Sequence, residues 1–209
     1  DHSIWEFRTR KLNFVFSKVM SWVAMDRATA IAELLHKNSY AELWKTESEK
    51  IKADIFEKGW KEEIQCFSQA YENNDYDSSL LLMHYYGFID ANDERFVKTV
   101  KSIRQHLQYK GLMYRYKSAD DFGHPSSSFT VCNFWMIQAL YAIGEKEESR
   151  RMFDSIVAYA NHVGLYSEDF DFETGRLLGN FPQAYSHLAF INAATLFSEE
   201  KVVSKFIRP

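Results

Sequence analysis

The sequence predicts an all-α protein, and three observations support this fold class. Apolar residues recur at spacings of three and four in about seven segments, which is typical of amphipathic helices. The 209 residues include only 8 glycines and 3 prolines, too few turn-forming residues for the many tight hairpins of a β-sandwich. With 46% apolar and 26% charged residues, the chain can bury a hydrophobic core and is not disordered. We expect a single domain without a linker.

The first two helices are predicted in the N-terminal quarter of the chain. One runs from Phe14 to His36, and its apolar stripe consists of Met20, Ala24, Ala28, Ile31 and Leu35. The next begins at Ser39, since Ser39 and Glu42 have the spacing of a capping box, and it ends at Gly59.

Two further helices are predicted in the middle of the chain. Asp77 is a suitable N-cap for a third helix, which reaches Tyr86. Asn92 is a suitable N-cap for a fourth, which ends near Gly111. Long loops are expected before and after this pair, and long loops on a rigid scaffold commonly carry binding and catalytic residues.

The last three helices complete the predicted set. The fifth spans residues 127–143 and the sixth spans residues 147–162, and the very short turn between them predicts a helical hairpin. The seventh is opened by Asn180 and Pro182, because proline is tolerated in the first turn of a helix.

Composition excludes several classes of function. The chain has 25 basic and 29 acidic residues, so no basic surface is expected and we exclude nucleic acid as a partner. No apolar run reaches the roughly 18 residues that span a membrane, so a membrane partner is excluded as well. Cys66 and Cys132 lie in separate apolar segments, where cysteine is usually a small buried residue rather than part of a disulfide or zinc site.

Three loops combine polar residues with aromatic ones, and two of their carboxylates suggest acid–base chemistry. Glu6 follows Trp5, and an apolar neighbour raises the pKa of a carboxyl group and makes it a plausible general acid. Glu168 lies among acidic and hydroxyl residues, where a carboxylate stays charged and can act as a base. Hydrolysis of a glycosidic bond needs such a pair. From spacing alone, helix-capping or surface roles are alternatives for both residues.

Several motifs occur in a fixed order along the chain. Residues 1–8 read DHSIWEFR and residues 16–28 read FSKVMSWVAMDRA. The later motifs are Tyr76-Asp-Ser-Ser-Leu-Leu-Leu82, Gly87-Phe88, Tyr114-Arg-Tyr116, Cys132-Asn-Phe-Trp135, Tyr159-Ala-Asn-His162, Ser167-Glu-Asp169 and Gly179-Asn-Phe-Pro-Gln-Ala-Tyr-Ser-His187. Together they resemble the bacterial and archaeal branch of glycoside hydrolase family 15, which includes glucoamylases, glucodextranases and trehalases.

This resemblance implies a fold and a set of site residues. The chain would be the later part, about seven helices, of a twelve-helix (α/α)₆ toroid. Glu6 falls at the position of the catalytic acid and Glu168 at that of the catalytic base. Arg115 corresponds to a sugar-binding arginine, and Trp5 and Tyr185 correspond to aromatic residues that line the sugar subsites. The resemblance implies no metal and no cofactor.

The expected function is that of an inverting, exo-acting α-glucosidase of the glucoamylase type, acting on an oligosaccharide or disaccharide. An α,α-trehalase and a non-catalytic helical scaffold are the alternatives. Substrate preference is open because the chain departs from the family pattern at residues 123–129 and at Asp169, where relatives usually have glutamate.

The chain begins with Asp1 rather than methionine, so we expect residues 1–209 to be one part of a longer catalytic domain, in a cytoplasmic protein. The earlier helices of the toroid would then be missing. We expect the isolated part to expose an apolar seam, to self-associate through it and to lack activity.

Overall fold

The computed structural model describes residues 1–198, and this part of the chain is mostly helical, as the sequence predicts. Its helices are α1 (Val15–Leu34), α2 (Asn38–Lys58), the short 3₁₀ helix η1 (Ser78–Leu82), α3 (Glu94–Leu107), α4 (Thr130–Ala142), α5 (Lys146–Val157) and α6 (Ala184–Thr195). None of the helices described is long and apolar enough to cross a membrane.

Short strands, which the sequence analysis did not predict, lie in the loops between helices. They are β1 (Trp60–Lys61), β2 (Cys66–Phe67), β3 (Gln108–Tyr109), β4 (Leu112–Met113), β5 (Ser127–Phe129), β6 (Asp169–Asp171) and β7 (Leu177–Leu178). The first four form two antiparallel pairs, and the last three form one antiparallel sheet in the order β5-β6-β7. Phe129 is paired with Asp169 in this sheet, so the start of α4 lies beside the segment that contains Glu168.

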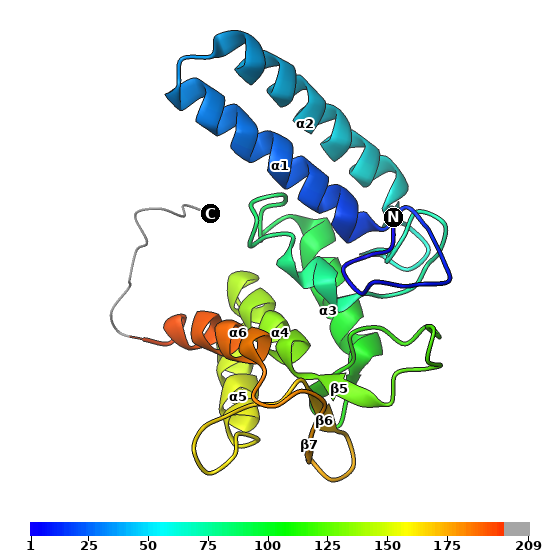
Figure 1. Cartoon of the computed structure of the whole chain (residues 1–209), viewed down its shortest axis with the longest axis vertical. Helices are drawn as coiled ribbons and strands as arrows, with labels where there is room; N and C mark the ends of the chain where they lie inside the picture. Colours follow the sequence, from blue (N-terminus) through cyan, green and yellow to red (C-terminus); the bar gives the residue numbers. More distant parts are fainter. Residues whose placement is uncertain (199–209) are drawn as a thin grey trace.

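The helices form an open arrangement rather than a closed ring (Figure 1). Helices α1 and α2 make a long antiparallel hairpin that projects from the rest of the molecule, while α4, α5 and α6 pack together at the other end. The structure therefore shows a mostly helical fold, and the complete toroid remains a proposal.

Helix α4 is the centre of the core. Ten of its 13 residues are buried, so it has no polar face. Helices α3 and α5 cover it with one buried face each and expose charged residues on the other. Burial of α4 on all sides explains why it reads in the sequence as a nearly continuous apolar run.

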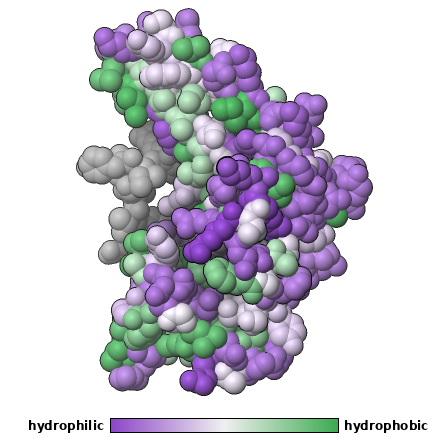
Figure 2. Space-filling view, turned by 45° about the vertical axis from the view of Figure 1, so that its right-hand side comes forward, coloured by the Kyte–Doolittle hydropathy of each residue, from purple (hydrophilic) through white to green (hydrophobic). Residues whose placement is uncertain are grey.

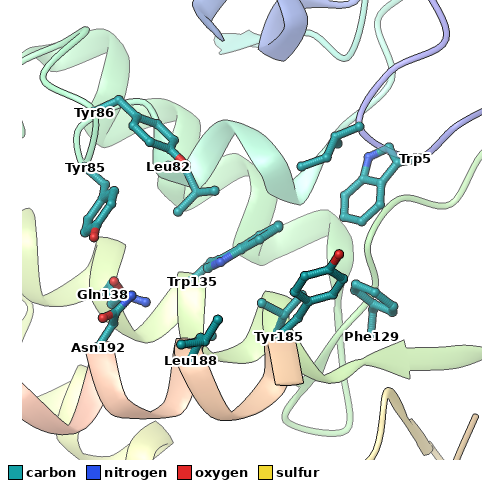
Figure 3. A pocket seen from close by; sticks show the side chains of 13 residues that line it. Trp5, Leu82, Tyr85, Tyr86, Phe129, Trp135, Gln138, Tyr185, Leu188 and Asn192 are labelled. Carbon is teal, nitrogen blue, oxygen red and sulfur yellow. The ribbon is translucent and has the colours of Figure 1, made fainter. Parts of the chain in front are cut away.

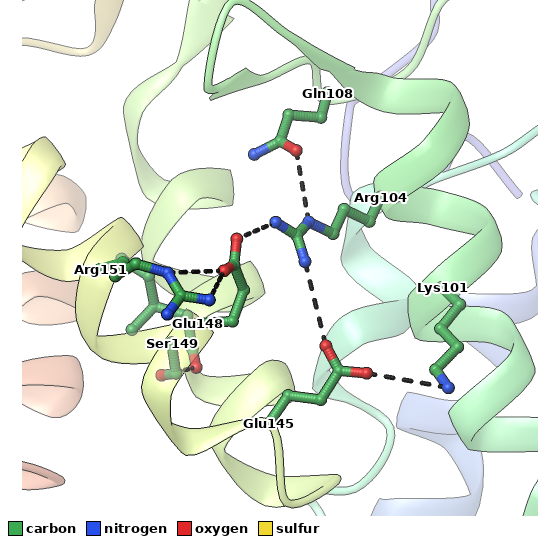
Figure 4. A network of polar contacts seen from close by, with 8 residues as sticks. Lys101, Arg104, Gln108, Glu145, Glu148, Ser149 and Arg151 are labelled. Carbon is green, nitrogen blue, oxygen red and sulfur yellow. Dashed lines mark hydrogen bonds and ion pairs between the residues drawn. The ribbon is translucent and has the colours of Figure 1, made fainter.

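Charged residues join α3 to α5 at the surface (Figure 4). Arg104 forms ion pairs with Glu148 and, at 3.9 Å, with Glu145. Lys101 also approaches Glu145, at 3.7 Å. Partly exposed ion pairs contribute little energy each, so this network mainly orients the two helices.

The predicted start of α2 and the predicted end of the third helix need correction. Helix α2 begins at Asn38 without a side-chain cap, so the capping box predicted at Ser39 is wrong. Asp77 caps the third helix as predicted, accepting a hydrogen bond from the Ser79 N–H, but that helix is a five-residue 3₁₀ helix that ends at Leu82 instead of Tyr86. All five side chains of η1 are buried, so its tertiary contacts override the helical pattern.

The later helices are shorter than predicted, and strands replace part of the predicted fourth and fifth helices. Asp93 rather than Asn92 caps α3, and α3 ends at Leu107 because the β3–β4 hairpin turns at Gly111, whose φ is +83°. Residues 127–129, predicted as the start of the fifth helix, form β5. The sixth helix ends at Val157, and the seventh begins at Ala184, two residues after Pro182.

Apolar side chains are exposed on two parts of the molecule. On the α1–α2 hairpin and on α6 these are Ile31, Leu34, Leu35, Tyr40, Leu43, Tyr185, Leu188 and Ile191. Figure 2 shows hydrophobic surface on the projecting hairpin. Self-association through these residues stays a prediction.

Asn133 provides a stability test of the region that positions the site. It is fully buried, accepts a hydrogen bond from the Met113 N–H at 2.9 Å and donates to Ser128 Oγ at 2.9 Å. Asn133→Ala leaves these groups without a partner and should lower the free energy of unfolding by about 2–3 kcal/mol. Denaturant unfolding measures this change.

The exposed Asn92 serves as the matched control. Asn92→Ala should change the free energy of unfolding by less than about 0.5 kcal/mol. A similarly small effect of Asn133→Ala would show that these buried hydrogen bonds do not hold β4 and β5 to α4.

Candidate active site

Trp5 is held in place by a buried carboxylate. Its indole Nε1 lies 3.0 and 2.9 Å from the two carboxylate oxygens of Asp77, which is only 2% exposed. Asp77 also accepts hydrogen bonds from Gln69 Nε2 at 3.2 Å, from Ser79 Oγ at 2.6 Å and from the Ser79 N–H at 2.8 Å. Burial raises the pKa of Asp77, and the donors around it oppose that effect. Asp77 thus joins the N-terminal loop to η1.

The Trp5 ring is also the centre of an aromatic cluster. Its centroid lies 5.8 Å from that of Tyr116, 5.7 Å from that of Phe129 and 6.1 Å from that of Trp135. These partners come from three separate segments, so the contacts fix the N-terminal loop against the β5–α4 junction.

Glu6 follows Trp5 in a tight turn. Its backbone is left-handed, with φ of 56°, and its N–H donates to the Ser3 carbonyl oxygen. The Glu6 side chain is exposed and forms no hydrogen bond or ion pair with residues 1–198. The apolar surroundings that the sequence suggested for this carboxyl are therefore not formed by the described part of the chain.

Glu168 lies directly before β6 and is held by the segment that leads to α6. Its Oε2 accepts hydrogen bonds from Asn180 N at 3.1 Å and from Asn180 Nδ2 at 2.9 Å. Gly179 is required here, because its φ is +74° and a Cβ atom would lie 2.8 Å from that oxygen. The carbonyl oxygen of Glu168 accepts from the Thr130 N–H, so the carboxylate is fixed relative to α4.

A cavity with a volume of about 490 Å³ lies beside Trp5 (Figure 3). Trp5, Phe129 and Tyr185 lie at one end, and Tyr85, Gln138 and Asn192 lie at the other, with Trp135 and Leu82 between them. A mostly apolar cavity with a few polar groups is typical of a small-molecule site. It is large enough for a sugar ring.

A smaller cavity of about 180 Å³ lies on the other side of Phe129 and contains charged residues. Arg115 donates to Asp120 at 3.1 Å and shares this cavity with Asp169. The pKa of Asp169 is raised to about 6, chiefly by burial; Arg115 opposes this rise and the charge of Glu168 contributes to it.

Three of the five predicted site residues line one of these two cavities. Trp5 and Tyr185 line the larger cavity, and Arg115 lines the smaller one. Glu6 and Glu168 line neither, but each is the chain neighbour of a lining residue, Trp5 in one case and Asp169 in the other.

Sequence analysis missed the roles of Phe129 and Asp77, which contact Trp5 from distant positions in the chain. Asp77 belongs to the motif of residues 76–82, and this motif is the sequence signal that could have indicated its role. No group of three histidine, cysteine, aspartate or glutamate residues that could hold a metal occurs within residues 1–198.

Residues 1–195 match the family described as "Glycosyl hydrolases family 15". The chain belongs to glycosyl hydrolase family 15. It is 42% identical over 208 residues to a trehalase of Thermoplasma acidophilum, covering 98% of the chain and 36% of that relative. A trehalase of Mycobacterium tuberculosis is 40% identical over 196 residues, covering 92% of the chain and 29% of that relative. The chain thus spans about a third of the length of these family members.

Solved structures agree with this family membership at the level of the fold. A glycosidase variant in complex with glucose superposes with a TM-score of 0.78 at 15% identity, covering 92% of the chain and 54% of that structure. A wild-type glycosidase superposes with a TM-score of 0.76 at 16% identity, covering 91% of the chain and 53% of that structure. At these identities, the two comparisons show a similar helical fold and carry no information about activity.

The raised pKa of Asp169 predicts how stability depends on pH. A carboxyl whose pKa is higher in the folded chain destabilises the fold as pH rises from about 4, its value in the unfolded chain, through about 6. Asp169→Asn removes this cost, so the variant should gain about 3 kcal/mol in free energy of unfolding above pH 6 and nothing below pH 4. Denaturant unfolding at several pH values measures the gain.

Asp154, which is exposed on α5, provides the matched control. Asp154→Asn should differ from the parent chain by less than about 0.5 kcal/mol across this pH range. If the stability gained by Asp169→Asn does not depend on pH, burial of the charged carboxylate is not its cause.

Proposed function

We propose that these 209 residues are part of the catalytic domain of an inverting α,α-trehalase. Relatives named trehalase that are 40% and 42% identical over almost the whole chain carry this proposal. They favour trehalose over the glucoamylase-type substrate expected from the sequence. The domain would be an (α/α)₆ toroid, of which this chain forms the later part.

In this mechanism two carboxyl groups act on opposite sides of the bond that is cleaved. Glu168 accepts a proton from water as the water oxygen bonds to the anomeric carbon. Glu6 gives its proton to the glycosidic oxygen as the bond from that oxygen to the anomeric carbon breaks. One glucose leaves with an inverted anomeric carbon, and proton exchange with solvent restores both carboxyl groups.

The two cavities support binding of a disaccharide. Trp5 and Tyr185 offer aromatic faces in the larger cavity, and aromatic faces pack well against the C–H groups of a sugar ring. Arg115 offers hydrogen-bond donors in the smaller cavity, where Asp120 orients it. Because the chain leaves α1 and α6 with exposed apolar faces, we expect the isolated 209 residues to be inactive without the rest of the domain.

The full-length protein tests the proposed acid and base. Glu6→Gln and Glu168→Gln should each lower kcat for trehalose by at least about 100-fold, since each removes a group that transfers a proton. Glu49→Gln, at an exposed position of α2, is the matched control and should retain full turnover. Release of glucose from trehalose, maltose and isomaltose is measured for each variant.

Faster release from maltose than from trehalose by the parent enzyme would contradict the trehalase assignment and favour a glucoamylase-type activity. Normal turnover by Glu168→Gln would show that another carboxylate acts as the general base, and the neighbouring Asp169 would be the next candidate. No release from any substrate would favour the non-catalytic scaffold.

A further inference from the structure

The loop that carries Glu6 is fastened to a distant loop by Asp121. One carboxylate oxygen of Asp121 accepts a hydrogen bond from the Arg8 N–H at 2.6 Å. The other accepts from the Thr9 N–H at 3.0 Å and from Thr9 Oγ1 at 2.5 Å. A single side chain therefore holds two consecutive residues that begin two positions after Glu6.

The loop that supplies Asp121 is itself well anchored. The neighbouring Asp120 accepts hydrogen bonds from Tyr116 Oη at 2.7 Å, from Arg115 at 3.1 Å and from the Phe122 N–H at 2.7 Å. Asp120 and Phe122 also line the smaller cavity. Asp121 thus sets the position of the N-terminal loop relative to the wall of that cavity.

Glu6 depends on its chain neighbours for its position. Its side chain has no hydrogen-bond partner in the described part of the chain, and its backbone is left-handed. On its N-terminal side, Trp5 is held by Asp77. On its C-terminal side, His2 Nδ1 lies 2.5 Å from the carbonyl oxygen of Phe7 within the same loop. Asp121 is the nearest side chain from outside this loop that holds its backbone, at Arg8 and Thr9.

We propose that Asp121 is a positioning residue for Glu6, holding the C-terminal side of its turn so that the carboxyl group reaches the leaving oxygen. This inference rests on the proposed function, in which Glu6 is the general acid. A general acid must lie within hydrogen-bond distance of the atom it protonates, and small displacements reduce the rate strongly. Loss of Asp121 should therefore impair protonation of the leaving group more than any other step.

Glu72, which lies between β2 and η1, offers a matched comparison because it tethers the same N-terminal loop. Its carboxylate accepts hydrogen bonds from Asn13 N at 3.0 Å and from Asn13 Nδ2 at 2.6 Å. This tether resembles that of Asp121 in kind, but it holds the loop where it joins α1, seven residues after Glu6. Its loss should affect stability without moving Glu6.

The test compares two substrates of the full-length protein. Trehalose needs a proton on its leaving oxygen, whereas the fluoride of α-glucosyl fluoride leaves without one. We expect Asp121→Asn to lower kcat for trehalose at least about tenfold and to keep kcat for the fluoride within about twofold. Glu72→Gln should keep both values, and Glu6→Gln should show the same difference between substrates as Asp121→Asn, in a larger degree.

Two results for Asp121→Asn would overturn the positioning role alone: an equal loss on both substrates, which indicates general damage to the site, or normal kcat on both. Normal turnover of trehalose by Glu6→Gln would overturn the proposed acid and this inference together. The two failures are therefore distinguished by the variant in which they occur.

Thr9→Val, which removes only the hydroxyl donor to Asp121, should lower kcat for trehalose by a smaller factor than Asp121→Asn and should leave kcat for the fluoride unchanged.

Discussion

The arrangement of the candidate site depends on one buried carboxylate. Asp77 lies under the aromatic cluster and accepts hydrogen bonds from Trp5, Gln69 and Ser79, which belong to three segments of the chain. A buried charge is costly unless donors surround it, so Asp77 selects the one arrangement in which all three segments meet. Trp5 then packs against Phe129, which forms part of the wall of both cavities.

Two adjacent carboxylates, Glu168 and Asp169, have different surroundings. Glu168 is held by the N–H groups of Asn180, whereas Asp169 lies in the smaller cavity with Arg115. Successive side chains of an extended segment point to opposite faces, which explains why neighbours in the sequence differ so much. Such differences allow chemically identical groups to take separate roles in one site.

Local sequence patterns predicted part of this structure and could not predict the rest. The helical periodicity of α1 and the cap at Asp77 depend on neighbouring residues, so both were predictable. The stripe predicted for α1 is wrong, however, because Met20, Ile31 and Leu35 are exposed and the helix buries Val15, Phe16, Val19, Trp22 and Ala32. The strands have two or three residues each, too few for a visible alternation, and η1 is shaped by its burial. Motifs indicated Glu6 and Glu168 as candidate site residues, but the contact of Asp121 with Arg8 spans 113 positions and leaves no local signal.

The anomeric form of the released glucose tests the proposed mechanism most directly. Proton NMR of the full-length protein acting on α,α-trehalose, recorded before mutarotation, distinguishes the two possible outcomes. Inversion at one anomeric carbon releases α- and β-glucose in equal amounts, because the leaving glucose keeps its configuration. This is the result expected if Glu6 and Glu168 act as acid and base around one water molecule. Release of α-glucose alone would show retention and contradict that mechanism.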